Sequence, residues 1–179
     1  MIFNKTKIEG VYNIEPELLP DERGFFARSF CKDEFRSHGL ETDIVQCNIS
    51  HNKKKGTLRG MHYQVPPSEE AKIVSCTRGS IYDVVVDLRR DSQTYRQWVA
   101  GELSENNFKM MYIPRGCAHG FQTLADNTVV YYQMTGFYHP ECARGLRWDD
   151  TALKIEWPIS NLTISKKDLS YTDLPDVKK

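Results

Sequence analysis

The sequence predicts an all-β protein, an antiparallel sandwich or barrel with only short helices. About ten short stretches have strand-like composition, and turn residues bound them at a spacing of roughly 8–12 residues. Where polar and apolar residues alternate, as over residues 44–50, one face of the strand is expected to be buried. No internal repeat or low-complexity linker interrupts the pattern, so we expect a single domain over residues 1–179.

In chain order, the elements are separated by Gly, Pro and charged turn residues. A turn from Pro20 to Gly24 precedes the second strand, a short helix is expected over residues 33–39 with Gly39 as its C-cap, and Arg78-Gly79 predicts a tight hairpin. The expected strands cover residues 11–14, 25–30, 44–50, 57–64, 71–77, 80–88, 98–103, 110–113, 121–124 and 129–135.

Composition and charge are those of an ordinary globular protein. Hydrophobic residues make up 40% of the chain and the formal net charge is +0, so no global field attracts nucleic acid or an anionic membrane. The five cysteines are widely spread without a C-x-x-C pair, which favours reduced thiols. Neither a signal-peptide core nor a run as long as a membrane span is visible. We therefore expect a cytoplasmic protein with neither nucleic-acid nor membrane partners.

The stretch from Gly56 to Gln64 contains the first candidate site residue. Because side chains alternate along a strand, we expect Leu58, His62 and Gln64 on one face and Arg59 on the other. A histidine on an inner face indicates a pocket, although a buried, hydrogen-bonded structural histidine gives the same pattern.

Further polar residues are expected to face the interior. His119 begins a strand after a Pro- and Gly-rich turn, and Lys72 begins another. Tyr131 and Tyr132 must point to opposite sides of their strand, so one of them faces inward. Asp83 and Asp87 share a face among valines, where each needs a cationic or histidine partner, and for Asp83 we suggest His119.

Two histidines in a small β-barrel also suggest a metal site. The run from Pro114 to His119 resembles the second motif of metal-binding cupins, but the first motif needs His-x-His and a carboxylate where this chain has His62-Tyr63-Gln64. Only His62 and His119 remain as candidate ligands, too few for a protein metal centre. We therefore expect no metal.

Several motifs lie in a fixed order along the chain: residues 21–26 (DERGFF), 46–50 (QCNIS), 56–64 (GTLRGMHYQ), 83–89 (DVVVDLR), 113–121 (IPRGCAHGF), Tyr132, 138–140 (YHP) and 148–150 (WDD). From Gly10 to about Asp168 this set resembles the dTDP-4-dehydrorhamnose 3,5-epimerase family of the cupin superfamily. The resemblance implies a cupin jelly-roll sandwich or barrel with short flanking helices.

The resemblance also implies a reaction. The family acts on a nucleotide-diphosphate 4-keto-6-deoxyhexose without metal or organic cofactor, inverting carbons 3 and 5 through an enolate. By this resemblance His62 is the base, Asp168 its carboxylate partner, Lys72 the enolate stabiliser and Tyr132 the acid. Spacing alone would leave Lys72 a surface residue and Asp168 an exposed tail residue.

Substrate-binding residues follow from the same resemblance. Arg23 and Arg59 are expected to hold the diphosphate, Gln46 and Asn48 to bind nucleotide or sugar polar groups, and Tyr138 to stack on the base. His119 is expected near the sugar, and Phe26 and Arg28 are also assigned to substrate binding. The family equivalent of Arg23 reaches into the neighbouring subunit's site, which implies a homodimer with exchanged strands.

The chain departs from the family pattern at two positions. Arg28 stands where Glu is common, and Gln133 follows Tyr132 where Lys is usual. A dTDP-linked substrate is therefore expected, with CDP- or GDP-linked sugars as alternatives. Three other functions remain open: epimerisation at carbon 3 or carbon 5 alone, sugar binding without catalysis, and a metal-dependent cupin oxygenase.

Overall fold

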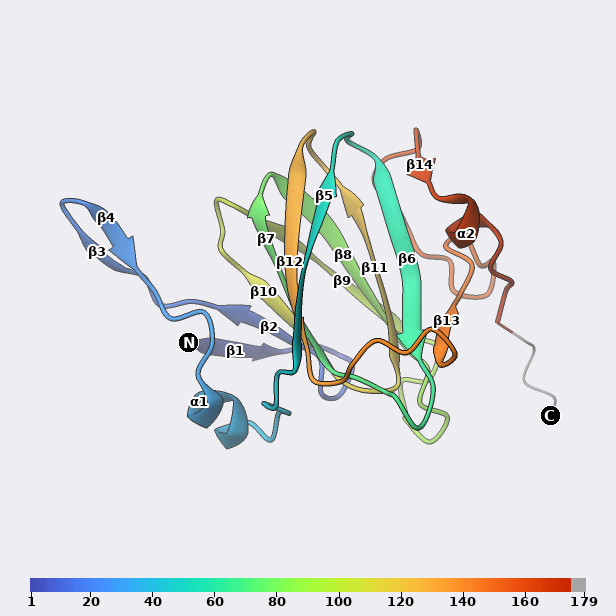
Figure 1. Ribbon diagram of the computed structural model, residues 1–179, viewed down its shortest axis with the longest axis horizontal. Coiled ribbons are helices and arrows are strands. Elements are labelled where there is room, and N and C mark those ends of the chain that lie inside the picture. Colours follow the sequence, from blue (N-terminus) through green and yellow to red (C-terminus); the bar gives the residue numbers. More distant parts are fainter. Residues whose placement is uncertain (175–179) are drawn as a thin grey trace.

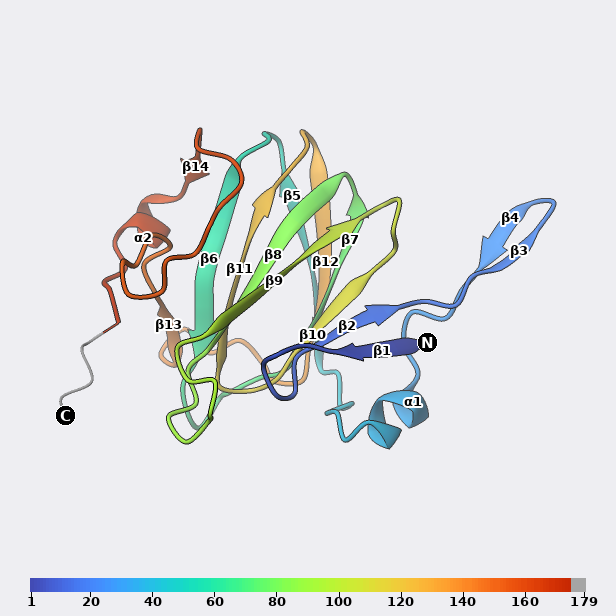
Figure 2. The same ribbon diagram turned by 180° about the vertical axis from the view of Figure 1, so that it is seen from behind.

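Two β-sheets that face each other form the body of the protein (Figures 1 and 2). The computed structural model describes residues 1–174. In spatial order the first sheet contains β1 (Ile2–Lys5), β2 (Tyr12–Glu15), β10 (Met110–Ile113), β7 (Lys72–Arg78), β12 (Thr128–Met134) and β5 (Gln46–Asn52). The second contains β13 (Ala143–Gly145), β6 (Thr57–Gln64), β11 (Cys117–Thr123), β8 (Ser80–Asp87) and β9 (Trp98–Ser104). Every pair along these paths is antiparallel, and β14 (Thr163–Ile164) adds to β6 in parallel.

The predicted antiparallel sandwich with short flanking helices is therefore confirmed. Helix α1 (Lys32–Ser37) ends as expected, with Gly39 at φ 71° donating its N–H to the carbonyl of Arg36. The short elements β1, β3 (Leu19–Asp21), β13, β14 and α2 (Lys166–Leu169) were not predicted, because an element of so few residues shows no readable periodicity. Neither helix within residues 1–174 is long and apolar enough to cross a bilayer.

The main hydrophobic core lies between the sheets. Val74 and Val130 of the first sheet pack with Val85, Leu103 and Phe121 of the second, and all are buried. Burying one such side chain stabilises the fold by about 1.5–3 kcal/mol. The two sheets are thereby fixed relative to one another.

A second apolar layer covers the outer face of the second sheet. Met61 and Val84 of the sheet pack there with Leu146, Leu153 and Trp157 of the C-terminal part of the chain. After this layer the chain returns to β6, and β14 and α2 lie beside that strand (Figure 1).

A hairpin formed by β3 (Leu19–Asp21) and β4 (Gly24–Phe26) projects away from the sandwich (Figures 1 and 2). Leu19, Phe25 and Phe26 on this hairpin are exposed. Large apolar side chains gathered on one projecting element mark an interaction surface.

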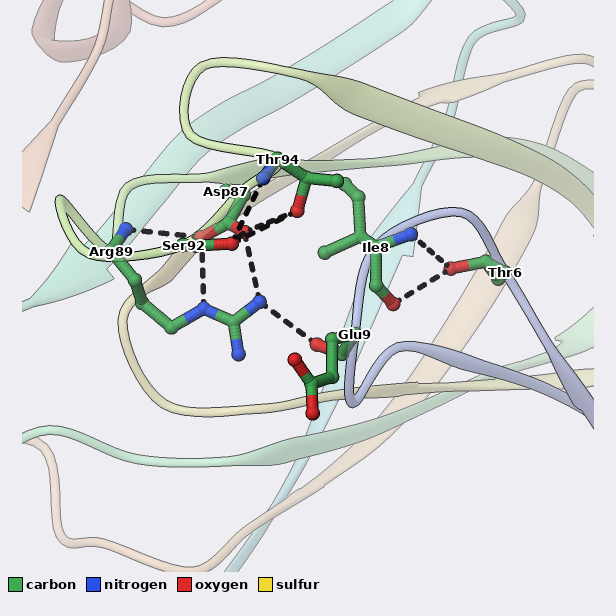
Figure 3. Close-up of polar contacts among 7 residues, drawn as sticks. All are labelled: Thr6, Ile8, Glu9, Asp87, Arg89, Ser92 and Thr94. Carbon is green, nitrogen blue, oxygen red and sulfur yellow. Dashed lines mark hydrogen bonds and ion pairs between the residues drawn. The ribbon is translucent and has the colours of Figure 1, made fainter.

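A buried carboxylate ties the loop after β8 to the turn between β1 and β2 (Figure 3). Asp87, fully buried, accepts hydrogen bonds from the Arg89 guanidinium at 2.8 and 2.9 Å, from Ser92 Oγ at 2.6 Å and from Thr94 Oγ1 at 2.8 Å. Arg89 Nη2 also donates to the Glu9 carbonyl at 2.8 Å. The prediction that Asp87 needs a cationic partner is confirmed.

These contacts make Asp87 a pH-dependent stabiliser. Burial by itself raises the pKa of Asp87, but the hydrogen bonds from Arg89, Ser92 and Thr94 outweigh it and lower the pKa from 3.8 to about 2. The unfolded chain therefore binds more protons than the folded one between these two values. The stabilisation is fully present above about pH 4 and is lost as the pH falls toward 2.

Asp87→Asn should lower the free energy of unfolding at pH 7 by about 2–3 kcal/mol, because the charge-assisted hydrogen bonds that lower the pKa of Asp87 are lost. It should also flatten the decline of stability between about pH 4 and 2. Urea unfolding at several pH values measures both effects, with Asp91→Asn, at an exposed position in the loop after β8, as the matched control. A variant with the wild-type slope would contradict the assignment.

Candidate active site

A cavity of about 540 Å³ lies between the sheets and contains most of the predicted site residues. Side chains of β5, β6, β7, β11 and β12 line it, together with residues after β12 and from α2. The predicted residues brought together here are Gln46, Asn48, Arg59, His62, Lys72, His119, Tyr132 and Tyr138. The cavity is large enough for a small organic ligand.

A β-bulge in β6 places Arg59 and His62 on the same side of the strand. His62 pairs with His119, whereas Arg59 pairs with Phe121, so two residues of β6 lie opposite Gly120 alone. The prediction that Arg59 faces away from His62 is wrong, because alternation assumes an unbroken register.

Glycines make the bulge possible. Gly60 has φ 137°, and a Cβ on it would lie 2.5 Å from the Cα of Gly120. Strand β6 and strand β11 therefore approach each other more closely than side chains allow.

His62 is hydrogen-bonded to a carboxylate from the C-terminal helix. Its Nε2 lies 2.8 Å from Asp168 Oδ1, and Asp168 is only 4% exposed. Ser165 caps α2 by accepting from the Asp168 N–H at 3.0 Å, which fixes the carboxylate's position. Gly60 N–H points at the other carboxylate oxygen, 3.5 Å away. Asp168 is thus a buried partner of His62, not an exposed tail residue.

The charge state of Asp168 follows from the same contacts. Burial raises its pKa, but the hydrogen bond and charge of His62 outweigh burial, and the net pKa is lowered. Asp168 is therefore ionised at neutral pH. Since Nε2 faces this anion, a neutral imidazole carries its proton on Nε2 and keeps the lone pair of Nδ1 free.

A second histidine–aspartate pair lies on the neighbouring strands. His119 Nε2 lies 2.7 Å from Oδ1 of the fully buried Asp83, which confirms the suggested pairing. Because His119 pairs directly with His62 across β11 and β6, the two imidazoles share one wall of the cavity.

Lys72 is buried in the cavity, with 9% of its surface exposed. Its Nζ lies 3.0 Å from Glu70 Oε1, and Glu70 Oε2 accepts from Gln64 Nε2 at 2.8 Å. The ammonium is therefore held in a fixed place by a carboxylate that is itself hydrogen-bonded.

Tyr132 faces the cavity and Tyr131 faces away, as alternation predicts. Burial raises the pKa of the Tyr132 phenol, and the nearby Arg59 offsets only part of that rise. The phenol is therefore fully protonated at neutral pH and able to donate.

A further group of polar residues lines the cavity. Arg59 Nε donates to Asn52 Oδ1 at 2.7 Å, Gln46 Nε2 donates to Asn48 Oδ1 at 3.1 Å, and Gln46 Oε1 accepts from the Tyr138 N–H at 3.1 Å. The ring of Tyr138 is about half exposed. An aromatic ring beside amides and a guanidinium suits a ligand with a flat base and anionic groups.

Arg23, Phe26 and Arg28 are not brought into this cavity. Arg23 lies on the projecting hairpin, where it pairs with Asp21, and 82% of its side chain is exposed. Phe26 is 68% exposed, and Arg28 pairs with Glu34 at 2.7 Å. Their part in substrate binding stays a prediction, and it requires a neighbouring subunit.

Among the cavity-lining residues that were not predicted from the sequence are Glu70, Arg144, Lys167 and Tyr171. Lys167 and Tyr171 lie close to Asp168 in the sequence. Their nearness to a predicted site residue could have identified them as candidates. Nothing in the local sequence marks Arg144. Gln133, one of the two departures from the family pattern, faces the outer side of the sheet with Tyr131.

The chain matches the profile of one protein family, described as dTDP-4-dehydrorhamnose 3,5-epimerase, over residues 5–176. A dTDP-4-dehydrorhamnose 3,5-epimerase from Methanothermobacter thermautotrophicus is 43% identical over 175 residues, covering 96% of this chain and 94% of the relative. The crystal structure of a dTDP-4-dehydrorhamnose 3,5-epimerase from Elizabethkingia anophelis superimposes with a TM-score of 0.94 at 38% identity, covering 97% of this chain and 96% of that one.

A third similar protein was solved with a ligand. The dTDP-6-deoxy-D-glucose-3,5-epimerase from Legionella pneumophila, in complex with dTDP-4-keto-L-rhamnose, gives a TM-score of 0.91 at 37% identity. The match covers 96% of this chain and 92% of that chain. The similarity thus extends over the whole sandwich and the C-terminal helix.

Gly60→Ala should disrupt the bulge, because the new methyl group overlaps Gly120 and the backbone keeps a φ that favours glycine. Strain and overpacking each cost about 1–3 kcal/mol, so the melting temperature should fall clearly. Gly24→Ala is a matched control with φ 136° and no atom within 4 Å of the added Cβ. Equal melting temperatures for the two variants would show that the contact with Gly120 is unimportant.

Proposed function

We propose that this chain, which belongs to the dTDP-4-dehydrorhamnose 3,5-epimerase family and is an isomerase, inverts carbons 3 and 5 of dTDP-4-dehydro-6-deoxy-D-glucose. One observation supports the proposal most directly: His62, which is hydrogen-bonded to Asp168, lines the same cavity as a buried lysine and a protonated tyrosine. The product would serve the synthesis of rhamnose or a related deoxysugar.

His62 is the base in this proposal. The keto group at carbon 4 acidifies the hydrogens on carbons 3 and 5, and Nδ1 of a neutral imidazole takes one of them. The ionised Asp168 then stabilises the imidazolium that forms and holds its orientation. A positioned base of this kind accelerates proton transfer by roughly 10²–10⁴-fold.

Lys72 stabilises the negative charge that develops on the oxygen at carbon 4. Its ammonium is already desolvated and fixed by Glu70, so little reorganisation accompanies the reaction. A preorganised donor of this kind contributes typically about 2.7–4 kcal/mol. The enolate chemistry itself needs no redox cofactor or metal, because the substrate carries its own activating carbonyl.

Tyr132 returns a proton to the opposite face of the ring. Its raised pKa keeps the phenol protonated, and the carbanion that it meets is a far stronger base than phenolate. Arg59 is assigned to the diphosphate, Gln46 and Asn48 to polar groups of the nucleotide or sugar, and Tyr138 to the base. The favoured nucleotide is dTDP.

The functional unit in this proposal is a homodimer with exchanged hairpins. Arg23 and Phe26 lie far from the cavity of their own chain, on a hairpin with exposed apolar residues. Docked on a second copy, this hairpin would bury that surface and bring Arg23 to the partner's diphosphate site. We place the protein in the cytoplasm, where its five unpaired cysteines stay reduced.

Incubation with dTDP-4-dehydro-6-deoxy-D-glucose in heavy water should introduce deuterium at both carbons 3 and 5. His62→Ala should abolish exchange at both carbons, because in this proposal the His62 imidazole removes both protons. NMR of the recovered sugar measures the label. Deuterium at one carbon only would support a mono-epimerase, and none at all would support a sugar-binding protein without activity.

In the same assay, Tyr132→Phe should impair inversion more than proton removal, because the base remains while the acid on the opposite face is lost. Tyr131→Phe is the matched control, since that neighbouring phenol faces away from the cavity. Equal loss of exchange and inversion in Tyr132→Phe would contradict the acid role.

Mixing two inactive variants should restore activity if hairpins are exchanged. In a heterodimer of Arg23→Ala and His62→Ala subunits, one site combines an intact His62 with the partner's intact Arg23. Unfolding and refolding an equal mixture should therefore recover about one-quarter of the wild-type rate, since half of the dimers are mixed and each has one intact site. Recovery no greater than the two variants refolded separately would contradict the exchange.

A further inference from the structure

Tyr171 lies against His62, yet the proposed mechanism gives it no role. The two ring centroids are 5.9 Å apart and the rings are inclined by 72°, so one ring presents its edge to the other. Edge-to-face contacts of this kind have a preferred geometry and resist rotation of either ring. Tyr171 also lines the cavity beside the imidazole.

Gly145 provides the space that the Tyr171 ring occupies. A Cβ on Gly145 would overlap three atoms of the ring, so the ring lies directly on the backbone of β13. Gly145 is the register partner of His62 in the β13–β6 pair. The pairing of β13 with β6 therefore places the tyrosine ring next to the imidazole.

Backbone hydrogen bonds hold the chain on both sides of Tyr171. Before it, the Ser170 N–H donates to the Lys167 carbonyl at 3.0 Å, closing α2. After it, the Arg147 N–H donates to the Thr172 carbonyl at 3.1 Å, which joins this segment to the residues that follow β13. Asp168 and Tyr171 therefore belong to one anchored segment and approach His62 together.

The His62 side chain needs a second restraint. It is 41% exposed, and the hydrogen bond to Asp168 fixes only one of its two nitrogens. An imidazole held at a single atom can still swing, and misplacement of a base by about 1 Å can cost 10²-fold in rate. The ring of Tyr171 adds an edge-to-face contact to the same imidazole.

We propose that Tyr171 is a positioning residue, whose ring holds the His62 imidazole with Nε2 on Asp168 and Nδ1 directed at the substrate. This inference rests on the proposed function of His62 as the base. The ring, and not the phenol hydroxyl, carries the effect.

Tyr171→Ala should lower kcat about 10- to 100-fold with little change in KM, because the substrate still binds while the base is misplaced. Tyr171→Phe should recover most of the lost kcat, since it keeps the ring. Thr172→Ala, the next and exposed residue, is the matched control. A rise in KM with unchanged kcat would make Tyr171 a binding residue, and failure of Tyr171→Phe to recover kcat would assign the role to the hydroxyl. Either result overturns the proposal.

Gly145→Ala displaces the ring without altering Tyr171. It should reduce kcat in the wild type and should have almost no effect in a Tyr171→Ala background, where the space is already empty. Additive losses in the double variant would mean that Gly145→Ala acts on β13 alone, and would count against the proposal.

A readout that needs no substrate separates this inference from the proposed function. In protein labelled with ¹⁵N-histidine, the His62 signals should show the tautomer protonated on Nε2, and Tyr171→Ala should broaden or mix these signals. If the wild type catalyses no exchange, the proposed function fails whatever the spectra show. If the wild type is active but Tyr171→Ala changes neither kcat nor the spectrum, the positioning role fails alone.

Discussion

The close approach of two glycines, Gly60 on β6 and Gly120 on β11, is the constraint on which the site depends. It inserts one extra residue into β6 and thereby turns Arg59 toward the same cavity as His62. It also directs the Gly60 N–H at the carboxylate of Asp168. Side chains at these two positions would hold strands β6 and β11 further apart, and that arrangement would be lost.

The C-terminal part of the chain packs on the second sheet and reaches His62. Its apolar residues cover the outer face of the second sheet, and this burial stabilises the path that returns α2 to β6. The helix has only four residues, so its position derives from packing and from its Ser165 cap, not from helix propensity. The helix supplies the carboxylate that is hydrogen-bonded to one nitrogen of His62, and the segment just after the helix supplies the aromatic ring of Tyr171 beside the imidazole.

Four buried carboxylates have a cationic or histidine partner, and each pair has a distinct place in the fold. Asp87 with Arg89 closes the loops at the end of β8, Asp83 with His119 and Asp168 with His62 support the two imidazoles, and Glu70 holds Lys72. Pairing offsets the cost of desolvating these groups and fixes their positions before substrate arrives. Pairing of buried carboxylates therefore stabilises the loops at the end of β8, and it fixes the positions of the side chains that line the cavity.

The sequence by itself determined most of the longer strands, the inward direction of His62 and of one of two adjacent tyrosines, and the need of Asp83 and Asp87 for partners, because alternation and the cost of buried charge are local properties. Resemblance to a family supplied the roles of Lys72 and Asp168. Only the tertiary structure decided that Arg59 lines the same cavity as His62 and that Tyr171 packs on Gly145. It also decided that Asp168, which is 106 residues from His62 in the sequence, is buried against that histidine. These depend on strand register and on the contact of distant segments, which no local pattern encodes.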